Sequence, residues 1–96
     1  MRVLLKATLD TEKTNDLIRS GRMPDVMREA LDRTKPEAAY FGLLGGRRTA
    51  LLFFDMQDSA QLPPLGEPFL VEMNARVEVC PVMNPDDLTK GLSELG

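Results

Sequence analysis

Apolar and polar positions divide this chain into short segments of two kinds. Four stretches carry apolar residues over the length of a β-strand, namely residues 3–9, 38–44, 48–54 and 75–82. Elsewhere apolar residues recur at the helical period, which predicts helices from Thr11, from about Pro24 to Pro36, over 67–72 and from Pro85. Pro24 either begins a second helix or kinks a continuous one, because it cannot donate a backbone hydrogen bond.

Local signals indicate where several elements begin or turn. Asp10 is a suitable N-cap for the first helix, and Asn84 is one for the last helix, where Pro85 follows at the first helical position. Gly45-Gly46 separates two apolar runs and predicts a β-hairpin, since a primed turn needs a positive φ that glycine adopts without penalty. An apolar stripe marks the last helix, formed by Leu88, Leu92 and Leu95.

The segment over 56–74 is less regular than the rest of the chain. It contains three prolines, which are Pro63, Pro64 and Pro68. Because proline interrupts the helical hydrogen-bond ladder, we expect no long helix here and only a short one over 67–72. We expect Phe69 and Leu70 to turn inward from that short helix.

Residues 50–54 form an unbroken apolar run, Ala-Leu-Leu-Phe-Phe. Successive side chains of a strand point to opposite faces, so this strand is apolar on both faces, whereas a strand with one wet face alternates. Both faces should therefore be covered. The few helices that a chain of 96 residues provides can cover one face. We expect a second copy of the chain to cover the other, which predicts a homodimer.

The order strand, helix, strand, strand, helix, strand predicts an α+β fold of the ferredoxin-like kind, a βαββαβ sandwich with a four-stranded antiparallel sheet plus a C-terminal helix. In this topology the first and third strands are central. The fourth strand lies at an edge, in agreement with Pro81, which cannot donate to a ladder. The length of 96 residues predicts a single domain over residues 1–96.

Composition narrows the possible partners. The net charge is −3, from 12 basic and 15 acidic residues spread along the chain, so no basic stripe favours nucleic acid. The N-terminal apolar run is too short for a signal peptide, and no segment reaches membrane-spanning length. The single cysteine, Cys80, excludes an internal disulfide and suits a reducing compartment. We therefore expect a cytoplasmic protein that binds neither nucleic acid nor membrane.

With these elements and the apolar run over 50–54, the chain resembles the dimeric α+β barrel proteins, in which two ferredoxin-like sheets pack face to face. Its ending over 77–88, Val-Glu-Val-Cys-Pro-Val-Met-Asn-Pro-Asp-Asp-Leu, looks like that of short bacterial proteins of unknown function within that group. The group includes muconolactone isomerase, small cofactor-independent monooxygenases acting on polycyclic phenols, and haem-degrading enzymes. This chain has no His and no Trp, so it departs from the Asn, Trp and His constellation of the haem-degrading enzymes and has no imidazole to ligate haem.

The absence of histidine also excludes Ser-His, Cys-His and His-metal sites. Three polar side chains remain on otherwise apolar strand faces, and they are Lys6, Tyr40 and Glu78. The first and fourth strands are neighbours in the expected sheet, so Lys6 and Glu78 lie close on one face. They form either a cross-strand ion pair near the dimer seam or a catalytic pair, in which the lysine stabilises an enolate and Glu78 is the base. Tyr40 has two interpretations. It is an aromatic residue of the interface or the core, or it is a third catalytic group.

Other motifs have simpler interpretations. Gly45-Gly46 followed by Arg47 and Arg48 links two strands, so it favours a hairpin with solvated turn charges over a phosphate cradle. Asp86-Asp87 favours a helix cap over a metal pair. Cys80 is interpreted as a small buried hydrophobe rather than a reactive thiol. Several methionines either line a plastic pocket or fill gaps, namely Met23, Met27, Met56, Met73 and Met83.

Two classes of function agree with these residues. The first is a homodimeric binding or structural protein, without a cofactor or metal, whose cleft between sheet and helices accepts either a small, mostly apolar metabolite or nothing. The second is a cofactor-independent isomerase or monooxygenase that uses Lys6, Glu78 and Tyr40, as the resemblance implies. The sequence favours the first class, because no cluster of polar residues requires a catalytic explanation.

Overall fold

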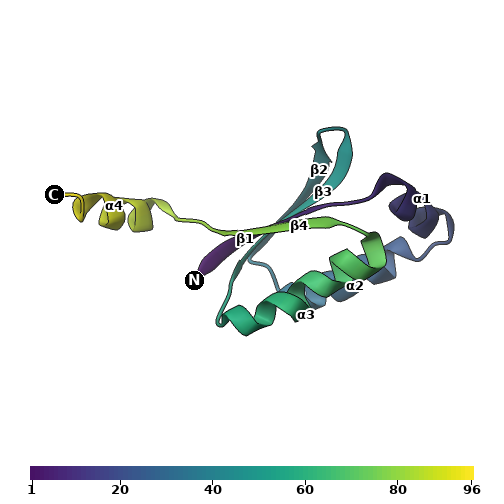
Figure 1. The fold of residues 1–96 in the computed structure, drawn as a ribbon, viewed down its shortest axis with the longest axis horizontal. Coiled ribbons are helices and arrows are strands. Elements are labelled where there is room, and N and C mark those ends of the chain that lie inside the picture. The colour runs from purple at the N-terminus through teal and green to yellow at the C-terminus, as the bar shows by residue number, and fades with distance from the viewer.

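An antiparallel sheet with the strand order β2-β3-β1-β4 forms the centre of the molecule in the computed structural model, which describes residues 1–96. Its strands are β1 (Arg2–Thr8), β2 (Ala38–Leu44), β3 (Arg47–Asp55) and β4 (Arg76–Pro81). The helices are α1 (Thr11–Arg19), α2 (Met23–Thr34), α3 (Leu62–Glu67) and α4 (Pro85–Ser93), with the short turns η1 (Ser59–Gln61) and η2 (Pro68–Glu72) (Figure 1). The α+β class and the four-stranded antiparallel sheet expected from the sequence are confirmed.

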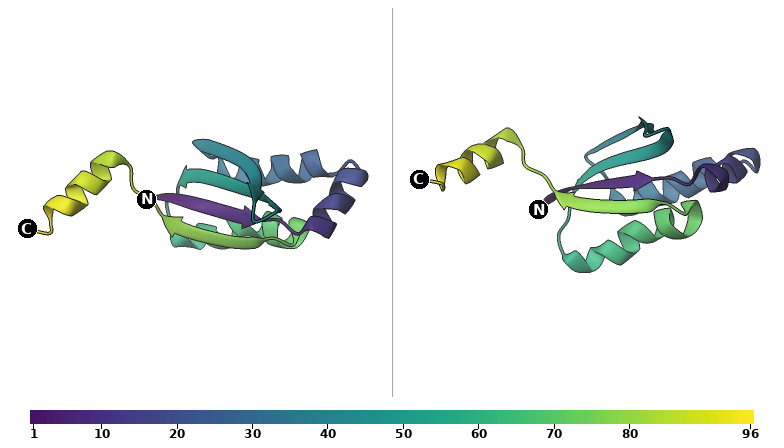
Figure 2. Two further views of the ribbon diagram at one scale, coloured as in Figure 1. Left: turned by 90° about the horizontal axis from the view of Figure 1, so that it is seen from above. Right: turned by 45° about the horizontal axis from the view of Figure 1, so that its top comes forward.

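One face of the sheet carries the hydrophobic core. Helices α2 and α3 and the turn η2 lie along this face, α1 lies beyond the end of β1, and the opposite face carries no helix (Figure 2). The strands contribute buried side chains at alternate positions: Val3, Leu5 and Ala7 from β1 and Ala50, Leu52 and Phe54 from β3. The helical side adds Leu17, Val26, Ala30, Phe69 and Met73. We call the face without helices the open face.

The expected signals at the element ends are confirmed. The Asp10 carboxylate accepts a hydrogen bond from the Lys13 amide, 2.9 Å away, and so caps α1. Gly45 and Gly46 form the β2–β3 turn with φ of 60° and 75°. A new helix, α2, begins at Met23 with Pro24 in its first turn, which decides between the two possibilities for that proline.

The segment after β3 differs from the expectation. Helical backbone runs from Leu62 to Met73 despite the prolines, because two of them stand in the first turn of α3, where no amide donor is needed. At Pro68 the helix widens into a π-helical turn, which accommodates the missing amide. Phe69 is fully buried as expected. Leu70 is 45% exposed, so the prediction that it turns inward was wrong.

The C-terminal helix α4 projects away from the body (Figure 1), and the molecule measures 56 × 28 × 18 Å along its principal axes. Asn84 caps this helix by accepting from the Asp87 amide, while the Asp87 carboxylate accepts from the Asn84 amide. No residue of α4 is buried, and its apolar stripe is exposed at Leu88 and Leu92, as is Leu95 just beyond the helix. None of the helices combines the length and the apolar character needed to cross a membrane.

Candidate functional site

Lys6, Tyr40 and Glu78 lie in a single row across the open face. The strand register pairs Tyr40 with Leu51, Leu51 with Lys6, and Lys6 with Glu78. Because neighbouring strands are roughly 4.8 Å apart, β3 keeps Tyr40 about 10 Å from Lys6. The structure therefore brings Lys6 and Glu78 together, as expected, and holds Tyr40 at a distance.

The Lys6 ammonium and the Glu78 carboxylate form a cross-strand ion pair. Nζ of Lys6 lies 3.9 Å from Oε2 of Glu78, and the two side chains are 37% and 51% exposed. An ion pair this open to solvent contributes little to stability. A general base in such a place lacks the enclosed, water-poor environment that usually adapts a carboxylate to catalysis.

Apolar side chains surround this row on the open face. Leu4, Leu51 and Phe53 are half-buried within the single chain, and Tyr40 is 64% exposed on the edge strand β2. Cys80 also lies on this face, opposite Leu4, and is exposed. The expectation of a buried Cys80 was wrong, because β4 is an edge strand and its Cys80 side chain points away from the helices.

A mostly apolar pocket lies on the other side of the sheet, between the edge strand β2 and the helices α1 and α2. Its volume is about 460 Å³, and it is lined by Ile18, Gly21, Met23, Pro24, Met27 and Phe41. No charged residue lines it. We call it the apolar pocket. It is the feature of the structure that fits the expected binding site between sheet and helices.

The local sequence explains how the apolar pocket forms. Gly21 adopts a φ of 76° between α1 and α2, a conformation that favours glycine, and the chain then turns into α2. Phe41 pairs with the buried Ala50 and so points to the helical side of the sheet, yet it remains 54% exposed. Met23 and Met27 line the pocket, which agrees with the interpretation of the methionines as pocket residues. Met56 and Met73 instead fill the core.

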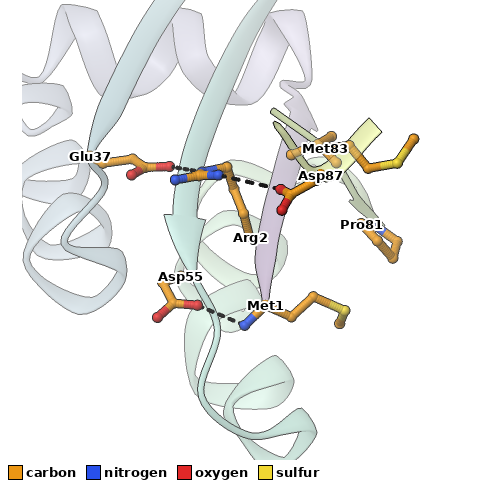
Figure 3. Close-up of a pocket in the computed structure, with 8 residues that line it drawn as sticks. Met1, Arg2, Glu37, Asp55, Pro81, Met83 and Asp87 are labelled. Atoms are coloured by element: carbon orange, nitrogen blue, oxygen red, sulfur yellow. Dashed lines mark hydrogen bonds and ion pairs between the residues drawn. The ribbon is translucent and has the colours of Figure 1, made fainter. Parts of the chain in front are cut away.

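A second depression, of about 700 Å³, lies where α4 leaves the body. Figure 3 shows how its charged groups face one another. Nε of Arg2 lies 2.6 Å from Oε1 of Glu37, and Nη1 of Arg2 lies 3.8 Å from Oδ2 of Asp87. The Met1 ammonium donates to Oδ1 of Asp55 at 2.7 Å. Each cation there has a carboxylate partner.

These contacts favour the charged forms of Arg2 and Asp55. The hydrogen bond and charge of Glu37 raise the pKa of the Arg2 guanidinium above its ordinary value. Hydrogen bonds from the Met1 ammonium and from Gln57 lower the pKa of Asp55 below 3.8. An acid or base for catalysis near neutral pH needs a pKa moved toward 7, so this network fits a structural role at the root of α4.

The remaining motifs also have structural positions. The Asp87 carboxylate serves the α4 cap and the Arg2 ion pair, so the cap interpretation of Asp86-Asp87 is confirmed. Arg48 is not a solvated turn charge: Nη1 donates to the Thr14 hydroxyl at 2.7 Å and ties the hairpin to α1. Arg47 is exposed beside the turn.

Comparisons with models of protein families, with curated protein sequences and with solved structures found no match to this chain.

Proposed function

We propose that this protein is a homodimer of ferredoxin-like subunits, assembled as a dimeric α+β barrel, that binds a small, mostly apolar molecule. The observation that carries the proposal is the apolar pocket. Its volume of about 460 Å³ lies within the range of small-molecule sites, and its lining contains no charge. Half-exposed Ile18 and Phe41 lie at this pocket, where a ligand would remove their apolar surface from water.

The dimer part of the proposal rests on the open face. Strand β3 directs Ala50, Leu52 and Phe54 into the core and places Leu51 and Phe53 on the open face. Two such faces related by a two-fold axis present the same apolar patch to each other. Packing of sheets face to face is the arrangement that covers them both.

Sedimentation velocity at micromolar concentration tests the dimer. We expect the wild type to sediment as a dimer and Leu51→Lys to sediment as a monomer, because the lysine places a charge at the centre of the patch. Leu70→Lys is the matched control, since Leu70 is an exposed leucine on the helical side. A monomeric wild type contradicts the dimer, and circular dichroism of each variant separates dissociation from unfolding.

Native mass spectrometry of the protein purified from its own host, with a fluorescence titration of the neutral probe N-phenyl-1-naphthylamine, tests the binding site. We expect a reproducible small-molecule adduct, and we expect Phe41→Gln to weaken probe binding. Leu43→Gln is the control, because Leu43 lies on the same strand and the same face but outside the pocket. Equal probe binding by wild type and Phe41→Gln contradicts the apolar pocket as the site.

The second candidate function is a cofactor-independent isomerase or monooxygenase that uses Lys6, Glu78 and Tyr40. It is supported by the single row in which these side chains lie and by the 3.9 Å between Lys6 and Glu78. Incubation of the adduct molecule with wild type and with Glu78→Gln tests it. Turnover that Glu78→Gln abolishes favours the enzyme, and no turnover by either protein contradicts it.

A further inference from the structure

Two arginines of this chain have no partner. Most of the others pair with a carboxylate, and these are Arg2, Arg19, Arg22, Arg28 and Arg33. Arg48 donates instead to Thr14 and to the Thr11 carbonyl. Arg47 and Arg76 take part in no side-chain hydrogen bond and no ion pair.

Both unpartnered arginines line the same depression. It lies on the open face at the hairpin end of the sheet, has a volume of about 440 Å³, and is lined by Lys6, Thr8, Leu44, Gly45, Arg47 and Arg76. We call it the cationic pocket. Thr8 and Arg76 face each other across β1 and β4, Lys6 stands two residues along β1, and Arg47 enters from the turn. Residues distant in sequence therefore converge on one space.

The charge in this pocket is not balanced. Three cations line it, and Glu78, beside Lys6, is the carboxylate that offsets one of them. The chain as a whole carries a net charge of −3, so the cationic pocket is a positive region on a protein whose net charge is negative. Cations gathered in one concave space repel each other, and an oxyanion placed among them relieves that repulsion.

We infer that the cationic pocket binds a small molecule through an oxyanion, a carboxylate or a phosphate. Guanidinium groups match both oxyanions through paired hydrogen bonds, and the Thr8 hydroxyl and Lys6 ammonium add donors. Leu44 lines the same space, at the hairpin end of the open face. The ligand is therefore a small molecule that carries an oxyanion, and the pocket has room for a short apolar portion of it.

This site is separate from the apolar pocket, which lies on the other side of the sheet. The two proposals can therefore fail separately. A protein that binds the neutral probe but no oxyanion supports the apolar pocket alone, and the reverse result supports the cationic pocket alone.

The test is a titration of the ¹⁵N-labelled protein with inorganic phosphate and, separately, with benzoate, followed by amide chemical shifts. We expect saturable shifts around Thr8, Arg47 and Arg76, and Arg47→Gln/Arg76→Gln should weaken binding about tenfold or more. Tighter binding of phosphate identifies a phosphate ligand, and tighter binding of benzoate a carboxylate ligand.

Arg19→Gln/Arg28→Gln is the matched control, because it removes the same charge from two exposed arginines elsewhere on the surface. We expect this variant to bind like the wild type. Equal losses in the two double variants would show that general electrostatics, not the cationic pocket, attracts the anion. That result, or the absence of saturable shifts, overturns the inference.

Discussion

Arg2 and Asp87 form the only side-chain ion pair between helix α4 and the rest of the chain, with 3.8 Å between Nη1 and Oδ2. Arg2 also binds Glu37, just before β2, so one guanidinium connects three parts of the molecule. Beyond it, a backbone hydrogen bond of 3.1 Å from the Val82 amide to the Arg2 carbonyl holds the start of the connection to α4.

Asp87→Asn should loosen α4 without unfolding the body. The asparagine oxygen can still accept from the Asn84 amide and keep the cap, but it has no charge to attract Arg2. We expect faster proteolysis within 82–96 and an unchanged thermal midpoint, because no residue of α4 is buried. Asp86→Asn is the control, since Asp86 lies in the same turn without an ion pair. Equal proteolysis of both variants would contradict a role for the Arg2 contact.

Asp55→Asn should flatten the acid side of the stability profile. The pKa of Asp55 is lowered in the folded protein, so its contribution is present above the ordinary value of 3.8 and is lost as the pH falls through the folded pKa. Urea unfolding at neutral pH should show a small loss for the variant, and the difference should shrink in acid. Asp32→Asn, at an exposed residue without an ion pair, should leave the profile of the wild type; a constant difference at all pH values would rule out this linkage.

Phe69→Ala should destabilise the protein by about 3–5 kcal/mol, because Phe69 is fully buried and its removal leaves a cavity. Leu70→Ala, one residue further along the same turn, should change stability by less than about 0.5 kcal/mol, since Leu70 is 45% exposed. Denaturant unfolding of both variants measures the difference. Similar losses would mean that η2 presents another face to the core.

Gly46→Ala should cost about 1–2 kcal/mol, because Gly46 has a φ of 75° that an L side chain rarely adopts. Gly42→Ala is the control within the same hairpin. A Cβ at Gly42 meets no atom within 4 Å, and the residue is not in the left-handed region. Thermal unfolding should therefore distinguish the two substitutions, and equal midpoints would argue against a turn that requires glycine.

Local sequence signals predicted the framework well. The Gly45-Gly46 turn and the caps at Asp10 and Asn84 each depend on neighbours within a few residues, and all three are confirmed. The pairing of Lys6 with Glu78 followed once the order of the strands was assumed. Periodicity and turn chemistry are sufficient for such features, because they act over short distances along the chain.

Features that depend on tertiary packing escaped prediction. Leu70 looked internal by composition, but the π-helical turn at Pro68 sets which side chains reach the core. Arg48 looked solvated, yet the fold places Thr14 within reach. The apolar pocket combines Ile18 and Phe41 from separate elements, and no local pattern joins them. For that pocket, the paired methionines Met23 and Met27 were the one signal available.

The projection of α4 makes it a lever. Its nine residues span about 14 Å, so a rotation of about 20° at residues 82–84 would sweep the far end through about 5 Å. Small changes around Arg2 are thereby amplified at Leu95, whose side chain is 83% exposed. The position of the C-terminal tip is thus governed from the N-terminal strand, at the opposite end of the sequence.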